Sequence, residues 1–336
     1  MIKTAIIGCG AMGKSHALSC KDSRLIEIVA YCDIDYAQAQ LLASQMGGKA
    51  YDDVEKMLNN EDIDAVVIAT PDHLHKDAFI ACSKACKAIM LEKPFATNLD
   101  DASKMMDAIK ENNTIVQMAH LFRFLPFYIN MKNAASNGEL GEILSAYSIS
   151  TNRIFVPTKM LKWAQNSSPS WFLMSHTIDA LMWICDSYGY KVSARGIKKK
   201  LVSMGIDTYD IIKAELILKN DVICTLEANW IFPDSYPIMA GINMSITGSE
   251  GSICTNTADP IMQKATGDAY SIPGILEYDI GDYHVGLRRN MLEAFARSVE
   301  DKKPILASAN DGFETLKVLC AIDKSLNNDG KQIIIE

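Results

Sequence analysis

The stretch from Thr4 to Asp33 constrains the fold of this chain more than any other. A short apolar run leads into a glycine turn, a helical pattern follows, and a second apolar run ends at an acid. This order is typical of a dinucleotide-binding unit, in which backbone N–H groups at the start of the helix bind phosphates. The predicted phosphate-binding turn contains Gly8, Gly10, Ala11, Met12 and Gly13.

Each glycine of this turn meets a separate steric need. Gly8 permits the tight turn out of the strand, Gly10 lets the backbone approach a pyrophosphate, and Gly13 lets the helix pack against the sheet. The alternative is a tight turn between strand and helix that binds no ligand.

Asp33 stands twenty residues after Gly13. A carboxylate at this position can hydrogen-bond the ribose diol of a dinucleotide. Its charge would repel a 2′-phosphate, so the sequence predicts NAD as the cofactor. Tyr36 and the turn before it leave NADP as an open alternative.

Length, charge and cysteine usage limit the remaining possibilities. The chain of 336 residues is long enough for two domains. A net charge of −8 argues against partners such as nucleic acid or an anionic membrane surface. No apolar run reaches the length of a membrane span, and no leader is expected before the first strand. The nine cysteines are scattered without a metal-binding pattern, which predicts reduced thiols, a cytoplasmic location and no metal site.

Strand and helix patterns alternate with short polar joins through residues 1–121. The run from Ala65 to Ala69 is apolar without interruption, as expected for a parallel strand that is covered on both faces. We therefore predict an α/β Rossmann domain with a doubly wound parallel sheet over residues 1–121. Ligands of such sheets bind beyond the carboxyl ends of the strands, where Thr70–His75 and Glu92–Pro94 are located.

The pattern changes after Leu121, where strand-like segments begin to follow one another directly. Consecutive strands favour antiparallel pairing. Residues 122–336 are therefore expected to form an α+β domain with a large, mainly antiparallel open sheet, which binds substrate. The expected strands are 143–150, 192–197, 209–218, 221–230, 243–247 and 252–255, and the closing helices are 287–300 and 310–327.

Lys93 is the most suggestive single residue, because it follows a buried strand and precedes Pro94, which favours an extended backbone. A lysine beside a nicotinamide can hydrogen-bond a substrate oxygen and stabilise developing negative charge. The alternative is a surface lysine paired with Glu92.

His176 and Asp179 are three residues apart in a helical pattern, so their side chains are neighbours. An imidazole that is oriented by a carboxylate is a suitable general base. The alternative is a histidine that is only packed against its surroundings.

Other polar and aromatic residues remain open in their roles. His73 and His75 alternate in a turn, where contact with a cofactor or a structural role is favoured over metal binding because no third ligand is indicated. Arg123 is expected either to hold a substrate or to anchor the helix that follows it. Tyr283 precedes the helix at 287–300 and is a further candidate for substrate binding.

Taken together, these motifs resemble the Gfo/Idh/MocA family (glucose-fructose oxidoreductase and inositol dehydrogenase) along almost the whole chain. The segment 70–75, Thr-Pro-Asp-His-Leu-His, is similar to the T-P-N-x-x-H turn of that family, and Glu92-Lys93-Pro94 matches its most specific tripeptide. His176 and Asp179 match its H-x-x-D helix, Ile246–Gly251 its I-x-G-x-x-G turn, and Asp311-Gly312 its closing pattern.

The resemblance implies an NAD(P)-dependent dehydrogenase of sugars, polyols or related compounds. His176 would remove the hydroxyl proton as hydride leaves the substrate, and Lys93 would polarise the same oxygen. Asp179 would lie beside His176 on the same helix. A homodimer or homotetramer through the second-domain sheet is also implied. Besides the glycine turn and Asp33, the implied cofactor contacts are Thr70, Pro71, His73, His75, Glu92 and Lys93.

Two positions depart from the pattern of the family. Phe172 stands four residues before His176, where many members carry Asp, and Phe122 replaces the first Arg of an R-R-F-x-P motif. Both changes make the substrate pocket less polar. We therefore expect a substrate with an apolar or modified portion, or one that stacks on Trp171 and Phe172.

Three functions remain in competition at this point. The first is net oxidation or reduction of a sugar or polyol. The second is a transient oxidation with retained NAD that permits epimerisation, elimination or glycoside cleavage. The third is a non-enzymatic sensor of dinucleotide or sugar, which the absent Asp favours and the acid/base pair Lys93 and His176 disfavours.

Overall fold

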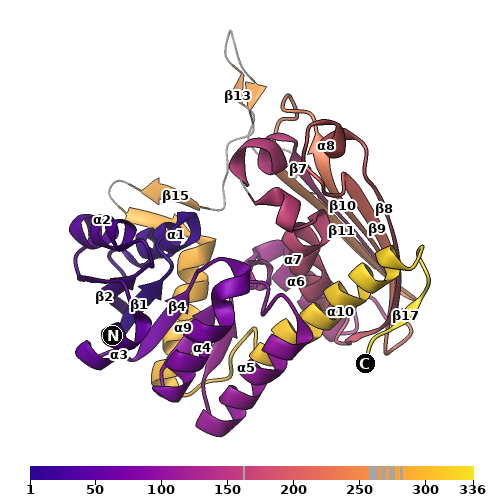
Figure 1. The fold of residues 1–336 in the computed structure, drawn as a ribbon. Coiled ribbons are helices and arrows are strands. Elements are labelled where there is room, and N and C mark those ends of the chain that lie inside the picture. Colours follow the sequence, from indigo (N-terminus) through magenta and orange to yellow (C-terminus); the bar gives the residue numbers. More distant parts are fainter. Residues whose placement is uncertain (162, 257–263, 266–269, 272–276, 281–282) are drawn as a thin grey trace. The chain divides into compact units, whose positions relative to one another are not determined.

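The computed structural model describes residues 1–161, 163–256, 264–265, 270–271, 277–280 and 283–336 (Figure 1). The chain divides into two compact units. Unit 1 consists of Met1–Phe124 and Gly274–Leu316, and unit 2 consists of Leu125–Pro273 and Lys317–Glu336. The chain thus returns to the first unit after residue 273, which a linear division after residue 121 does not anticipate.

Unit 1 contains a six-stranded parallel sheet in the order β3-β2-β1-β4-β5-β6, which confirms the predicted doubly wound fold. Its strands are β1 Ile2–Ile7, β2 Ile26–Cys32, β3 Lys49–Tyr51, β4 Ala65–Ile68, β5 Ala88–Leu91 and β6 Val116–Met118. Every residue of β4 and β5 is buried, because helices cover both faces of the sheet.

Helices and short turns connect these strands and complete unit 1. The helices are α1 Ala11–Cys20, α2 Tyr36–Met46, α3 Val54–Asn60, α4 His75–Lys84, α5 Leu99–Asn112 and α9 Leu287–Asp301, with 3₁₀ turns at Asp72–Leu74 and Leu121–Phe124. The returning segment also forms a hairpin of β15 Glu277–Ile280 and β16 Tyr283–Gly286. Asp35, Asp53 and Asn98 cap α2, α3 and α5 through their side chains.

Unit 2 is built on a seven-stranded sheet in the order β12-β11-β7-β10-β9-β8-β17. Only the pair β7 and β10 is parallel among the paired strands of this sheet, which confirms the mainly antiparallel prediction. The strands are β7 Ile143–Arg153, β8 Gly189–Ile197, β9 Ile211–Leu218, β10 Ile223–Phe232, β11 Ala240–Gly248, β12 Ser252–Asn256 and β17 Ile333–Ile334. A separate small pair joins β13 Lys264–Ala265 to β14 Tyr270–Ser271.

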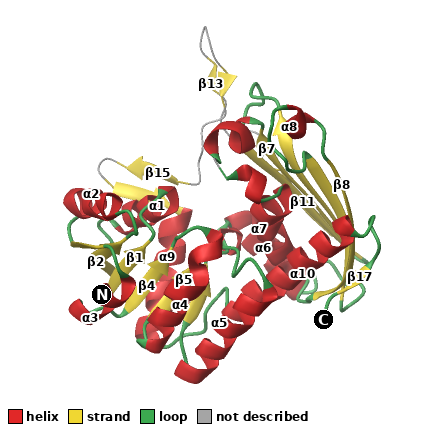
Figure 2. Cartoon of the chain, viewed as in Figure 1, coloured by secondary structure: helices red, strands yellow, loops and turns green. Residues whose placement is uncertain are grey.

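Helices cover one face of this sheet, as Figure 2 shows for α6, α7 and the end of α10. Burial alternates along β9, where Ile212, Ala214 and Leu216 face the helices and Lys213 and Glu215 face away. The helices are α6 Pro126–Ser136, α7 Ser175–Ile184, α8 Lys200–Ser203 and α10 Ala309–Asn327, with short turns at Val156–Met160, Ala164–Asn166 and Ser170–Met174. Helix α10 begins in unit 1 and ends in unit 2.

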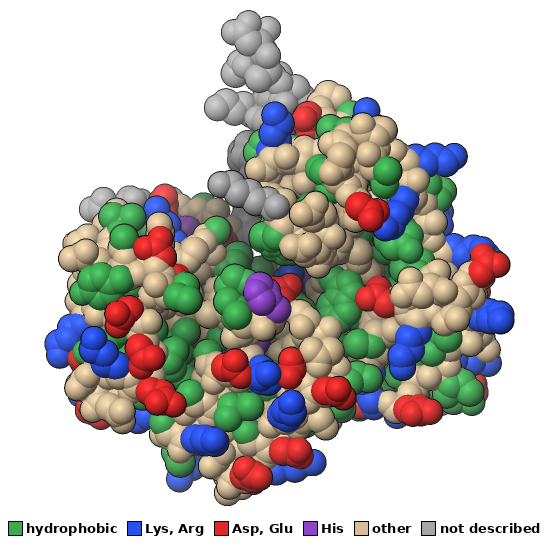
Figure 3. Space-filling view, in the orientation of Figure 1, with side chains coloured by type: hydrophobic (Ala, Val, Ile, Leu, Met, Phe, Trp, Pro, Cys, Tyr) green, Lys and Arg blue, Asp and Glu red, His purple; other side chains and the backbone are tan. Residues whose placement is uncertain are grey.

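Basic and acidic side chains are interspersed over the face drawn in Figure 3, in keeping with the modest net charge. None of the helices in the described ranges is long and apolar enough to cross a bilayer.

Candidate functional site: a dinucleotide cradle and its supports

The glycine turn has the geometry that a bound pyrophosphate requires. Gly8 has φ +92°, and a Cβ there would lie 2.6 Å from the backbone of Ala69 and Thr70. A Cβ on Gly13 would lie 1.8 Å from the Gly8 carbonyl oxygen. A Cβ on Gly10, by contrast, would have no described atom within 4 Å. The protein therefore has no packing need for glycine at position 10, whereas an approaching phosphate does.

The start of α1 leaves its backbone donors available. Gly10 is the N-cap, no side chain caps the helix, and its first turn carries no acidic residue. Gly10, Ala11 and Met12 are all exposed. Unpaired N–H groups and the positive end of the helix dipole favour an anion here, so these residues fit the phosphates of a dinucleotide.

Asp33 is positioned at the end of β2 by two backbone hydrogen bonds. One carboxylate oxygen accepts the N–H of Cys9 at 2.6 Å and the other accepts the N–H of Asp35 at 2.9 Å. These bonds tie the acid to the glycine turn and leave lone pairs for a ribose diol. Ile34 follows with 92% of its surface exposed.

The surroundings of Asp33 are acidic. Burial raises the pKa of the Cys32 thiol to about 12, and the charges of Asp53, Asp33 and Asp52 add to this effect. Three carboxylates close to one thiol create a field that disfavours the extra phosphate of NADP. The site therefore fits NAD.

The predicted cofactor contacts in the turn after β4 differ in their exposure to solvent. Pro71 and His73 are exposed, whereas His75 is fully buried. The His75 ring lies with Nδ1 3.0 Å from the Pro94 carbonyl oxygen and Nε2 3.2 Å from the Thr70 carbonyl oxygen. Burial lowers the pKa of His75. Its position indicates support of two turns rather than direct contact with a cofactor.

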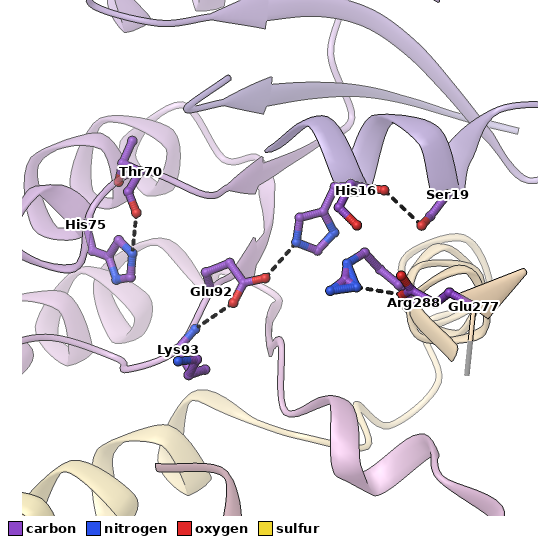
Figure 4. Close-up of polar contacts among 9 residues, drawn as sticks. His16, Ser19, Thr70, His75, Glu92, Lys93, Glu277 and Arg288 are labelled. Carbon is purple, nitrogen blue, oxygen red and sulfur yellow. Dashed lines mark hydrogen bonds and ion pairs between the residues drawn. The ribbon is translucent and has the colours of Figure 1, made fainter. Parts of the chain in front are cut away.

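Glu92 is likewise a supporting residue, because only 9% of its surface is exposed. Its Oε1 lies 2.8 Å from His16 Nε2, and its Oε2 accepts the backbone N–H of Lys93 at 3.3 Å (Figure 4). Burial raises the pKa of Glu92, but the hydrogen bond from His16 and the charges of His16, Arg288 and Lys93 outweigh burial and lower it to about 2. Glu92 is therefore held as an anion.

Lys93 follows this buried acid directly and is partly exposed, as a residue that meets a ligand must be. The Lys93–Pro94 peptide bond is cis. Arg288 of α9 completes the buried polar group, with its Nη1 donating to Glu277 Oε1 at 2.7 Å (Figure 4).

The residues His16 and Arg288 were not among the sequence candidates. A signal for His16 exists in the spacing of Gly13, His16, Ala17 and Cys20, which marks the inner face of α1. Nothing in the local sequence points to Arg288, which comes from the returning segment.

In unit 2, His176 and Asp179 lie on α7, as predicted. His176 is partly exposed and Asp179 is fully buried. The helix follows directly from a π-helical turn over Ser170–Met174. The spacing of three residues makes the two positions neighbours on the helix.

The two aromatic candidates of this turn, Trp171 and Phe172, have different contacts. The Phe172 ring packs against Trp163 and Trp230, with centroid distances of 6.3 and 5.9 Å. The Trp171 indole instead donates to Asp323 Oδ2 at 2.7 Å. Trp171 also lines a pocket of about 320 Å³ whose described lining does not include Phe172 or His176.

Arg123 is buried, with Nη1 donating to the Leu306 carbonyl oxygen at 2.7 Å and Nη2 3.1 Å from Asp311. This geometry fits the anchoring role rather than substrate binding. Tyr283 belongs to β16, but its side chain lies outside the described residues. No group of three or more metal-ligating side chains was found in the described ranges.

Two family models match the chain. An "Oxidoreductase family, NAD-binding Rossmann fold" model matches residues 2–120, and an "Oxidoreductase family, C-terminal alpha/beta domain" model matches residues 132–333. The chain belongs to the Gfo/Idh/MocA oxidoreductase family. The predicted family and its NAD-binding Rossmann domain are thereby confirmed.

Individual relatives are distant. Inositol 2-dehydrogenase of Salmonella typhimurium is 28% identical over 187 residues, which is 54% of this chain and 54% of that protein. The chain thus spans about half the length of that curated relative. Inositol 2-dehydrogenase of Acidothermus cellulolyticus is 25% identical over 270 residues, which is 80% of this chain and 76% of that protein.

Among solved structures, scyllo-inositol dehydrogenase from Lactobacillus casei with bound NAD(H) and scyllo-inositol has a similar fold. Its TM-score is 0.85 at 18% identity, over 100% of this chain and 99% of that chain. At this level of identity the likeness concerns the fold.

Proposed function

We propose that this member of the family is an NAD-dependent dehydrogenase that acts on a CH–OH group of a sugar, a polyol or a derivative of either. The observation that carries this proposal is the open cradle at Gly10, where no described side chain or backbone would obstruct a Cβ. The buried Glu92 connects this cradle to the partly exposed Lys93. The relatives from Salmonella and Acidothermus, which are named as inositol dehydrogenases, support the substrate class.

Bound NAD supplies the acceptor or donor of a hydride. Gly10, Ala11 and Met12 would hold its phosphates, and Asp33 its ribose diol. Lys93 would donate a hydrogen bond to the reacting oxygen of the substrate and stabilise the negative charge that develops there. His176 would take the hydroxyl proton during oxidation and return it during reduction, with Asp179 orienting the ring.

The substrate is proposed to carry an apolar or modified portion. Phe172 stands where many relatives have Asp, and its contacts with Trp163 and Trp230 belong to an aromatic group rather than a polar one. Trp163, Phe155 and Met160, which precede it in the chain, expose large apolar surfaces. Exposed apolar side chains of this kind bind a methyl, acyl or aromatic substituent better than a bare polyol.

The experiment is a panel of NAD-linked assays, preceded by titration of the protein with NADH. The panel contains free inositols and hexoses and their O-methyl and N-acetyl derivatives. We expect micromolar binding of NADH and faster turnover of the derivatives. Rapid oxidation of unmodified myo-inositol would overturn the apolar-substrate proposal, and failure to bind NADH would overturn the function as a whole.

The same panel separates the two alternatives. An enzyme with transient oxidation would retain NAD through purification and convert a sugar without accumulating NADH. A sensor would bind NADH and a sugar without turnover. The proposed acid and base, Lys93 and His176, favour an enzyme, because a sensor has no use for proton transfer.

We further propose that the chain forms a homodimer or homotetramer through the face of the seven-stranded sheet that points away from α6 and α7. Tyr147 and Ile223 point away from the helices on this face and are 38% and 47% exposed. Light scattering of Ile223→Lys should show a smaller particle than the wild type, and an unchanged mass would contradict this arrangement.

All nine cysteines are free, and six of them are buried. This usage supports a reducing compartment, and we propose the cytoplasm.

A further inference from the structure

We propose that His16 and Glu92 are positioning residues that hold Lys93 at a fixed place relative to the phosphate cradle. This inference rests on the proposed role of Lys93 and extends it to two buried residues. The pair would connect the helix that begins the cradle with the segment that carries the lysine.

The first observation is that one carboxylate serves two partners. Glu92 Oε1 accepts from His16, which belongs to α1, and Glu92 Oε2 accepts from the backbone of Lys93. His16 is fully buried, and its helix α1 starts directly after Gly10 of the phosphate-binding turn. The Glu92 side chain therefore connects α1 to the backbone N–H of Lys93 through two hydrogen bonds.

The second observation is that the backbone on the other side of Lys93 is also held. The Pro94 carbonyl oxygen lies 3.0 Å from Nδ1 of the buried His75, whose Nε2 contacts the Thr70 carbonyl. The N–H of Lys93 is thus bonded to the Glu92 carboxylate that His16 of α1 contacts, and the carbonyl of the next residue, Pro94, is bonded to His75 of α4. A side chain whose backbone is held at both ends explores fewer positions, which is the condition for a preorganised hydrogen-bond donor.

The third observation concerns what the contact between His16 and Glu92 contributes to stability. A buried polar pair is a weak source of stability, because the cost of removing both groups from water offsets their attraction. Well-packed apolar residues at 16 and 92 would often serve stability as well or better. The charges of Arg288 and Lys93 both act on the Glu92 carboxylate, so this acid faces the lysine as well as His16. Positioning of Lys93 explains why this pair is polar, whereas packing alone does not.

The test compares His16→Leu, which removes the donor, with His16→Gln, whose amide N–H can replace Nε2–H. With the most active compound of the substrate panel, we expect kcat of His16→Leu to fall by about 10- to 100-fold, the range found when supporting residues are removed. The dissociation constant of NADH should change by less than about threefold, and His16→Gln should keep kcat within about threefold of the wild type. Ser83→Ala, which removes a buried hydrogen bond to Ala108 elsewhere in unit 1, should leave kcat unchanged.

A double-mutant cycle shows whether the pair acts through Lys93. In a Lys93→Met background, His16→Leu should cause no further loss of the residual rate. Multiplication of the two losses would overturn the proposal, as would a folded His16→Leu protein with wild-type kcat.

A second measurement does not depend on turnover. Reductive ¹³C-methylation of lysines gives an NMR signal for Lys93, assigned by its absence in Lys93→Arg. In Glu92→Gln and His16→Leu this signal should move more than that of any other lysine. An unmoved signal would overturn the positioning role even if the dehydrogenase activity is real, whereas a moved signal in an inactive protein would leave the pair intact and contradict only the proposed reaction.

Discussion

The cofactor-binding part of unit 1 and the His176 region of unit 2 differ in how closely they follow their family. In unit 1, the glycine turn, Asp33 and the Glu92-Lys93-Pro94 segment have the expected geometry, and buried polar residues support them. In unit 2, His176 and Asp179 are present on α7, but the preceding turn places Phe172 among aromatic rings. NAD is common to many reactions and its contacts are constrained by one fixed molecule, whereas substrate contacts are free to change with the substrate.

The largest expected effect comes from Lys93→Met. Loss of the donor to the substrate oxygen should lower kcat by about 10³-fold, within the range for removed proton donors and oxyanion stabilisers. NADH binding, measured by its fluorescence, should stay within about threefold, because the glycine turn is untouched. Lys84→Met, a change at a surface lysine of α4, serves as the control. Undiminished turnover would remove Lys93 from the reaction.

The next effect concerns the buried acid of unit 1. The pKa of Glu92 is lowered from 4.5 to about 2 in the folded protein. A lowered folded-state pKa means that the ionised group contributes stability above pH 4.5, and that this contribution is lost as the pH falls toward 2. The shift corresponds to a contribution on the order of 3 kcal/mol.

Urea unfolding of the wild type and of Glu92→Gln at pH 7, 5 and 3 measures this contribution. The difference between the two proteins should be largest at pH 7 and should shrink at pH 3. A difference that is the same at all three values would show that Glu92 is not held as an anion.

Gly10→Ala and Gly13→Ala form a matched pair within the cradle. The Gly10 Cβ has no described neighbour within 4 Å, so this variant should keep its stability but bind NADH about tenfold or more weakly, because the methyl group occupies the place of a phosphate. The Gly13 Cβ would collide with the Gly8 carbonyl, so that variant should lose about 1–3 kcal/mol of stability. Equal effects of both changes on thermal unfolding would contradict the assignment of the cradle.

The smallest effect is expected in unit 2. Phe172→Asp introduces the acid that the family resemblance implies at this position, and it should shift the ratio of kcat/KM between myo-inositol and its O-methyl derivatives several-fold toward the free polyol. The change removes ring contacts with Trp163 and Trp230, so some loss of stability should accompany it. Phe172→Leu, which is apolar but not aromatic, should leave the substrate preference near that of the wild type. An unchanged ratio in Phe172→Asp would mean that position 172 does not select the substrate.

Much of the fold was open to prediction because its signals are local. The bounds of the helix at Tyr36–Met46 follow from local signals, since Asp35 caps one end and Gly47 with φ +84° ends the other. The burial pattern of β4 follows directly from its uninterrupted apolar run. Helix α7, by contrast, is preceded by a π-helical turn over Ser170–Met174, which no residue type in that segment indicates.

The supports of the site were not open to prediction in the same way. Glu92 and His75 are parts of recognisable motifs, but their burial depends on His16, which lies 76 residues before Glu92, and on the Pro94 carbonyl. The sequence allowed Arg123 either to bind a substrate or to anchor a helix. Its contacts with Asp311 and the Leu306 carbonyl favour the anchoring role. No periodicity shows which side chain a distant segment will bring to a given carboxylate.

The sequence by itself determined the two kinds of domain, the glycine cradle, the acid that favours NAD, and the residues proposed to handle the proton. These features depend on backbone sterics and on apolar periodicity, which act within a few residues of one another. Only the tertiary structure decided that residues 274–316 return to the first unit. It also decided that Glu92 and His75 are buried and hydrogen-bond to the surroundings of the site. The packing of Phe172 against Trp163 and Trp230 was decided in the same way. Each of these depends on packing between segments far apart in the chain, where burial and partner choice are set by the whole fold.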